Sequence, residues 1–324
     1  MNSNVKHVIL FSTFTFLTLA LTLASAYATT LTITVGNSPT EVAFDSHLGE
    51  IFVSNHDSGN TMSVISDATN TVTATVTVGR GPAGLAFDPH LNEVFVANEG
   101  SNTVSVIPDI TNKIQATITV GSRPVGVAFD PHLNEVFVCN FRSNTVSVIP
   151  DATNKVTATI AVGHGPAGLA FDSHLNEFFV SNFNSNTVSV ISDASNEVIG
   201  TIAVDSYPHG ITFDANRNEV FVANEGSDTV SAISDASNKI TANITVDISP
   251  ASVAFDSHLG EVFVSNYDGG SGNTVSVISD ATNTVKATVI VGSGPYGLAF
   301  DWNKNEIFVA NNVSDTVSVI SPQS

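Results

Sequence analysis

The chain has 324 residues, of which 42% are hydrophobic and 12% are charged, so it is long enough to bury a large core. Thirty acidic residues against ten basic ones give a net charge of −20, and that field repels the phosphates of nucleic acids and of anionic membrane surfaces. Neither is expected as a partner, and the single cysteine excludes an intramolecular disulfide.

The first 28 residues are typical of a secretory signal peptide. Lys6 supplies the positive charge, an apolar run spans residues 8–24, and small-x-small triplets end at Ala26 and at Ala28, which are the two cleavage sites. Retention of the run as a membrane anchor is the alternative, but the run is short for a full span. We therefore expect residues 29–324 to form one domain that is secreted, exposed on the cell surface or periplasmic, with no membrane span after cleavage.

The rest of the chain repeats one unit seven times. Each unit contains four stretches rich in Val, Ile and Thr, such as 83–88, 93–98, 103–107 and 114–120, separated by Gly, Pro, Asn and Asp. Seven such units predict an all-β fold, a seven-bladed β-propeller with four antiparallel strands per blade. The copies are marked by the phenylalanine of an AFD or TFD triplet, at Phe44, Phe87, Phe129, Phe171, Phe213, Phe255 and Phe300.

The two ends of the chain complement each other. The seventh unit stops after its third strand, whereas residues 29–35, TTLTITV, match the fourth strand VTATVTV of the first unit. We therefore predict that strand 29–35 completes the last blade, which closes the ring and removes two open sheet edges. A closed ring is expected to be monomeric.

The repeat resembles the YVTN-type β-propeller repeat family. The segments VFVAN, IFVSN and VFVCN stand where that family has YVTN, and TVSVI and ATITVG follow in the same order. The resemblance covers residues 29–320 and implies a seven-bladed ring in an exported or cell-surface protein. Similar rings also serve as lactonases and lyases, so the resemblance leaves an enzyme open.

A functional site must break the sevenfold symmetry, so the residues that differ between blades are its candidates. The loops that enter each first strand and those that join second to third strands emerge on one face, which we call the loop face. Glu41 departs most, because it stands on an innermost strand where five other units have Gly. The candidate ligand- or partner-binding residues are Glu41, Arg80, Glu99, Arg123, Arg142, His164, His209 and Tyr296.

The opposite face carries Asp-x-His turns, for which we expect turn-stabilising hydrogen bonds. We expect no cofactor. The alternative is weak binding of calcium, because the acidic residues of this face could hold cations loosely. Two N-x-S/T sequons are candidates for glycosylation in an exported protein, Asn243 in an outer strand and Asn312 in a loop, and the loop position is preferred. The turn histidines are His47, His90, His132, His174 and His258.

The sequence favours a binding or structural interaction module over an enzyme, because it contains no nucleophile elbow, zinc-protease motif or phosphate loop. A protein, small-molecule or glycan ligand is expected on the loop face, over the central channel. The alternative is a lactonase- or lyase-like enzyme with a divalent cation at the channel mouth, and no catalytic residue is assigned.

Overall fold

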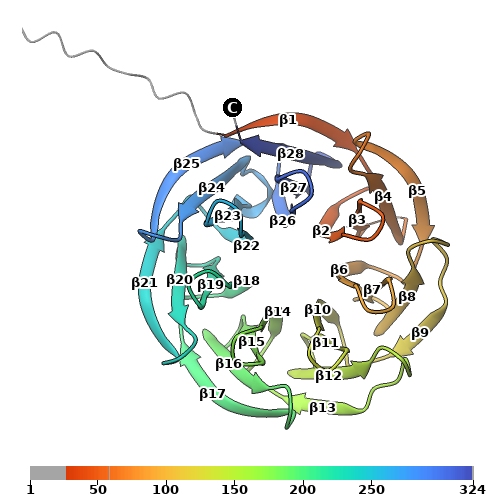
Figure 1. The fold of residues 1–324 in the computed structure, drawn as a ribbon, viewed down its shortest axis with the longest axis horizontal. Helices are drawn as coiled ribbons and strands as arrows, with labels where there is room; N and C mark the ends of the chain where they lie inside the picture. The colour runs from red at the N-terminus through yellow and green to blue at the C-terminus, as the bar shows by residue number, and fades with distance from the viewer. Residues whose placement is uncertain (1–26, 58, 323–324) are drawn as a thin grey trace, which may run out of the picture.

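The structure is a computed structural model that describes residues 27–57 and 59–322. These residues form a ring of seven four-stranded antiparallel sheets around a central channel (Figure 1). The seven-bladed architecture predicted from the repeat is confirmed. The predicted signal peptide lies outside the described residues, apart from Tyr27 and Ala28.

The strands in chain order are β1 (Tyr27–Thr34), β2 (Pro39–Asp45), β3 (Glu50–Asn55), β4 (Thr61–Ser66), β5 (Thr71–Thr77), β6 (Pro82–Asp88), β7 (Glu93–Asn98), β8 (Thr103–Pro108), β9 (Ala116–Thr119), β10 (Pro124–Asp130), β11 (Glu135–Asn140), β12 (Thr145–Pro150), β13 (Ala158–Ala161), β14 (Pro166–Asp172), β15 (Glu177–Asn182), β16 (Thr187–Ser192), β17 (Glu197–Ala203), β18 (Pro208–Asp214), β19 (Glu219–Asn224), β20 (Thr229–Ser234), β21 (Lys239–Thr245), β22 (Pro250–Asp256), β23 (Glu261–Asn266), β24 (Thr274–Ser279), β25 (Thr284–Ile290), β26 (Pro295–Asp301), β27 (Glu306–Asn311) and β28 (Thr316–Pro322).

Each blade runs outward from the channel, as in the order β6-β7-β8-β9 of blade 2. Its second and third strands have apolar side chains on both faces, and both faces are covered by neighbouring blades. Phe95 on β7, for example, packs with Val136 and Val138 on β11 of blade 3. Removing such a buried ring costs about 3–5 kcal/mol, so the interfaces between blades hold the fold together.

The ring is closed by β1, which pairs with β28 from Tyr27 opposite Pro322 to Thr34 opposite Thr316 (Figure 1). The strand begins two residues earlier than predicted, because Tyr27 is only 4% exposed. Its ring stands edge-on to Phe263 of blade 6 at 5.5 Å between centroids, and its hydroxyl donates to Glu261. Burial raises the pKa of Tyr27 to about 12.

The outer strands of blades 2 and 3 are shorter than those of the other blades. β9 covers Ala116–Thr119 and not 114–120, and β13 is equally short. At the end of the neighbouring third strand, Pro108 and Pro150 stand where other blades have Ser, such as Ser66, which pairs with Thr71. Proline has no N–H to donate, so the first residues of these outer strands lack a ladder partner.

Within the described ranges, the one helical segment is the 3₁₀ turn η1 (Asp268–Gly270). No helix there has the length and apolar character needed to cross a bilayer.

Candidate functional site

The mouth of the central channel on the loop face contains a cavity of about 450 Å³. This volume lies within the range of small-molecule sites. All seven blades contribute lining residues, because each innermost strand begins at this end of the channel. The residues that differ between blades therefore meet in one place.

Five of the eight candidate residues line this cavity, namely Glu41, Glu99, Arg123, His209 and Tyr296. The other three do not reach it. Arg142 and His164 line a separate surface pocket beside Arg123, and Arg80 is exposed and lines neither pocket.

The position within each loop explains the difference. The residue directly after the last residue of a second strand faces the cavity in five blades, whereas the next residue, such as Arg142, points elsewhere. Likewise Arg123, directly before a proline, reaches the cavity, and His164, one position earlier in its own loop, does not. The position directly after the second strand also supplies four cavity residues that are absent from the eight candidates, His56, Phe141, Tyr267 and Asn312.

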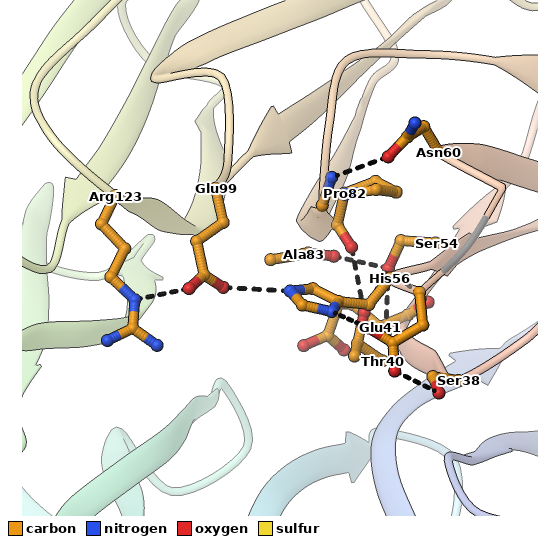
Figure 2. A network of polar contacts seen from close by, with 12 residues as sticks. Ser38, Thr40, Glu41, Ser54, His56, Asn60, Pro82, Ala83, Glu99 and Arg123 are labelled. Carbon is orange, nitrogen blue, oxygen red and sulfur yellow. Dashed lines mark hydrogen bonds and ion pairs between the residues drawn. The ribbon is translucent and has the colours of Figure 1, made fainter.

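One side of the cavity carries a charged network (Figure 2). The Arg123 Nε atom donates to Glu99 Oε1 at 2.5 Å, and His56 Nε2 lies 3.3 Å from Glu99 Oε2. The contact with His56, followed by that with Arg123, lowers the pKa of Glu99. The same contact raises the pKa of His56. Glu99 is therefore an ionised carboxylate held between Arg123 and His56.

Glu41 has a different environment. Its Oε1 atom accepts a hydrogen bond from the Val42 N–H at 3.2 Å, and no Lys, Arg or His among the described residues forms an ion pair with it. Burial raises the pKa of Glu41 to about 7. At neutral pH this carboxyl can therefore donate a proton, accept one, or pair with a cation that enters the cavity.

The other side of the cavity is aromatic. The Tyr296 ring stands edge-on to Tyr267 and to His209, with centroids 5.2 Å and 5.4 Å away. The Tyr296 hydroxyl lies 3.1 Å from His209 Nε2. His209 Nδ1 lies 2.9 Å from the carbonyl oxygen of Ala251, so Nδ1 donates there and Nε2 of the neutral ring accepts from Tyr296. Both rings are thereby fixed in orientation.

The backbone of Arg123 is in the left-handed region, with a φ of 59°. The equivalent loops of blades 2 and 4 have Gly81 and Gly165 at this position, and a side chain there costs about 1–2 kcal/mol. Asn102 Oδ1 accepts from the Arg123 N–H at 2.8 Å and stabilises the conformation. Ser38, Tyr207 and Ser249 have the same left-handed conformation at this position of blades 1, 5 and 6, so the conformation belongs to the repeated loop and only the charge is particular to Arg123.

We expect Glu41→Gln to change stability in a pH-dependent way. The raised pKa means that folded Glu41 keeps its proton while the unfolded chain loses it, so wild-type stability falls as pH rises from about 4.5 to 7 and then levels off. Gln cannot ionise, so E41Q should match the wild type at pH 4 and exceed it at pH 8 by about 1–2 kcal/mol, allowing for water in the cavity. Denaturant melts at both pH values measure this. Glu197→Gln, at an exposed position, is the control, and an E41Q advantage independent of pH contradicts the assignment.

The surroundings of the two sequons do not favour the loop position Asn312, which is preferred for glycosylation on the sequence alone. Asn312 lines the cavity, and its Nδ2 atom donates to the carbonyl oxygen of Pro39 at 3.3 Å. Asn243 on β21 is exposed, although its Oδ1 accepts from Ser231 at 2.8 Å. A glycan is therefore accommodated more easily at Asn243, and glycosylation at either position stays a prediction.

Fold and site together define a general seven-bladed β-propeller module with an asymmetric pocket at one end of its channel. The chain belongs to the YNCE-like beta-propeller family, whose sequence profile matches residues 17–178, half of the chain. Its structure is similar to that of Kuenenia stuttgartiensis hydrazine synthase, with a TM-score of 0.78 and 19% identity over 87% of this chain and 95% of that chain. At this identity the likeness shows the fold alone. No curated protein matches the chain.

Proposed function

We propose that this protein is an exported or cell-surface propeller of the YVTN type that binds a small ligand at the channel mouth. The proposal rests on one observation above all. The residues that differ between the blades meet in this cavity. Glu41 places a carboxyl there that has no ion-pair partner among the described residues. The signal-peptide pattern of residues 1–28 supports export.

The chemistry of the cavity favours a ligand with a cationic group on a partly apolar body. Besides burial, the charges of Glu225, Glu41 and Glu99 raise the pKa of Tyr296, so the potential around this hydroxyl is negative. Aromatic faces attract cations, and Arg123 is already paired with Glu99. An amine-bearing sugar fits this pattern, because its ammonium group can pair with Glu41 while its C–H face lies on an aromatic ring.

Calorimetric titration of residues 27–324 tests the binding role. Tetramers of glucosamine, N-acetylglucosamine and glucose share one ring type and differ in the ammonium group. We expect the glucosamine tetramer to bind at least about tenfold more tightly than the other two, and Glu41→Gln to remove that preference, since a charge-assisted hydrogen bond contributes about 1.5–3 kcal/mol.

His90→Asn, on the opposite face, is the matched control and should bind like the wild type. Equal binding of the three sugars, or equal loss in E41Q and H90N, would contradict the proposal.

A lactonase- or lyase-like enzyme is the second candidate, because a carboxyl with a pKa of about 7 suits a general base. Such an enzyme needs a divalent cation at the channel mouth. In the part of the chain that the structure describes, the groups of three closely spaced metal-ligating side chains lie at the opposite end of the blades, which favours the binding role. Turnover of a lactone panel that E41Q abolishes would reverse this preference.

A further inference from the structure

The face opposite the cavity contains a repeated cluster at the interfaces between blades. In blade 3, Asp130 ends the first strand, His132 lies in the following turn, and Glu135 begins the second strand. The His132 Nδ1 atom lies 2.7 Å from Oδ2 of Asp193, which belongs to blade 4. Blade 4 repeats the arrangement, with His174 Nδ1 lying 2.8 Å from Asp235 Oδ2 of blade 5. The turn role predicted for the aspartates is also present, since Asp130 Oδ1 accepts from the His132 N–H at 2.8 Å.

These clusters contain buried oxygens that have no partner. Asp130 and Asp172 are 0% exposed, and Oδ2 of each lacks a hydrogen-bond partner, as does Oε2 of Glu135 and Glu177. A carboxylate oxygen in that situation carries a large desolvation penalty. Each cluster therefore has buried acceptors that no hydrogen bond satisfies.

The donor atoms are close enough to share an ion. One ligand atom from each of Asp130, His132 and Asp193 lies within 4.8 Å of the other two, and the same holds for Asp172, His174 and Asp235. Among the described residues these are the two groups of three that meet this distance. The histidine side chains are 48% and 49% exposed, so an ion can enter from solvent while the carboxylates stay buried.

Other blades place a cation of the chain itself beside the equivalent glutamate. In blade 5, Asn216 replaces the histidine, and the neighbouring Arg217 Nε lies 3.6 Å from Glu219. In blade 6, Pro322 stands where the aspartate would be, and Lys286 pairs with Glu261. Glu135 and Glu177 have no such Lys or Arg among the described residues. In blades 5 and 6 the chain thus supplies a positive charge where the histidine-aspartate pair is missing. In blade 7, where Asn303 replaces the histidine, Glu306 instead accepts from the Ser321 hydroxyl.

We propose that the clusters Asp130–His132–Asp193 and Asp172–His174–Asp235 are two binding sites for a divalent transition-metal ion such as Zn²⁺, which clamps blade 3 to blade 4 and blade 4 to blade 5. Imidazole with carboxylates suits Zn²⁺, whereas Ca²⁺ takes six to eight oxygen ligands. The ion takes the place of the proton between His132 Nδ1 and Asp193 Oδ2, and the neutral imidazole then carries its proton on Nε2. Binding to a protonated imidazole releases one proton to solvent, so binding weakens at acid pH. Glu135 and Glu177 can supply a further oxygen.

Titration of Zn²⁺ into metal-free residues 27–324 tests the proposal by calorimetry and thermal melting. We expect about two equivalents to bind, tighter at pH 7.5 than at pH 5.5, and to raise Tm by about 10 °C at a hundredfold excess over Kd. Ca²⁺ at the same concentration should leave Tm unchanged. Co²⁺ should show a ligand-field absorption band that Zn²⁺ removes.

The double variant His132→Asn/His174→Asn should lose both sites and fold normally, because the chain itself has Asn216 and Asn303 at these positions. His47→Asn/His90→Asn is the matched control. The pairs of His47 with Asp109 and of His90 with Asp151 have the same 2.7 Å contact but are not among the groups of three ligand atoms within 4.8 Å, so this variant should keep both equivalents. Unchanged Zn²⁺ binding by the first variant, the same loss in both variants, or an equal effect of Ca²⁺ would overturn the proposal. These readouts do not depend on the ligand of the channel mouth.

Discussion

A protein that begins at Val35 and thus lacks β1 should melt about 10–20 °C below one that begins at Tyr27. β1 inserts Ile33 into the core shared by blades 7 and 1 and Tyr27 into the core shared by blades 6 and 7. Loss of two buried side chains and a full strand ladder removes at least about 5 kcal/mol. Without β1 the interfaces on both sides of blade 7 are incomplete, so the ring opens there first.

A protein that begins at Thr29 distinguishes the two predicted cleavage sites. It keeps most of the ladder but lacks Tyr27, whose ring contacts Phe263 and lies 5.5 Å from Lys286 Nζ. We expect it to melt between the other two, about 2–4 kcal/mol less stable than the protein that begins at Tyr27. Cleavage after Ala26 therefore yields the stable ring, whereas cleavage after Ala28 removes a core side chain.

Calorimetric melting of the three proteins measures both effects, and N-terminal mass analysis of the full-length chain after expression tests the predicted cleavage. Tyr27→Phe is the control, because it keeps the ring and loses only the hydroxyl contact with Glu261. Identical melting curves for proteins that begin at Tyr27 and at Val35 would show that β1 does not close the ring.

The sequence predicts this fold well because every blade repeats the same pattern of strands and turns. Seven copies of the four-strand pattern determine the number of blades, and the match between residues 29–35 and VTATVTV determines how the ring closes. The pattern could not show that Tyr27 is part of the strand, because that depends on Phe263 and Glu261 in a different blade. The shortening of β9, in contrast, could be predicted from the sequence, because Pro108 replaces a serine at the end of the neighbouring strand.

The candidate site could be predicted only in part. Differences between the repeats identify the loop face and Glu41, because the sequence itself shows a charged residue on an innermost strand where five other units have glycine. Which of two adjacent loop residues faces the channel depends on backbone direction, which the sequence does not show. The predicted site therefore contains Arg142 and lacks its neighbour Phe141. The pair between His132 and Asp193 could not be predicted from the repeat pattern, because it joins different positions of two neighbouring blades.

The close packing of the innermost strands explains why few of them carry a side chain at the position of Glu41, and it leads to the second prediction. A Cβ atom at Gly84 would lie 2.0 Å from the carbonyl oxygen of Val125 on the next blade. That oxygen belongs to a backbone held in its own sheet, so it cannot move away without separating the two blades. Gly84→Ala should therefore cost about 2–4 kcal/mol, at the upper end of the range for overpacking.

Gly200→Ala is the matched control for Gly84→Ala. A Cβ atom there meets Val190 Cγ2 at an ordinary 3.4 Å, and the chain has Ala74 and Ala242 at the equivalent positions of other outer strands. This variant should be neutral or more stable by up to about 1 kcal/mol. Urea denaturation of both variants measures the difference.

If the close approach of inner strands limits the cavity, Gly84→Ala should also weaken binding at the channel mouth, because separation of blades 2 and 3 moves Glu99 relative to Arg123.

Glu41 and Ser252 are the two positions where a side chain replaces this glycine. Gly297, next to Glu41, has no Cβ atom; one would lie 2.5 Å from Glu41 Oε1. A glycine on one blade thus makes room for the carboxyl of the next. Equal stability of Gly84→Ala and Gly200→Ala would show that the inner strands can separate freely, and that the position of Glu41 is not imposed by its neighbours.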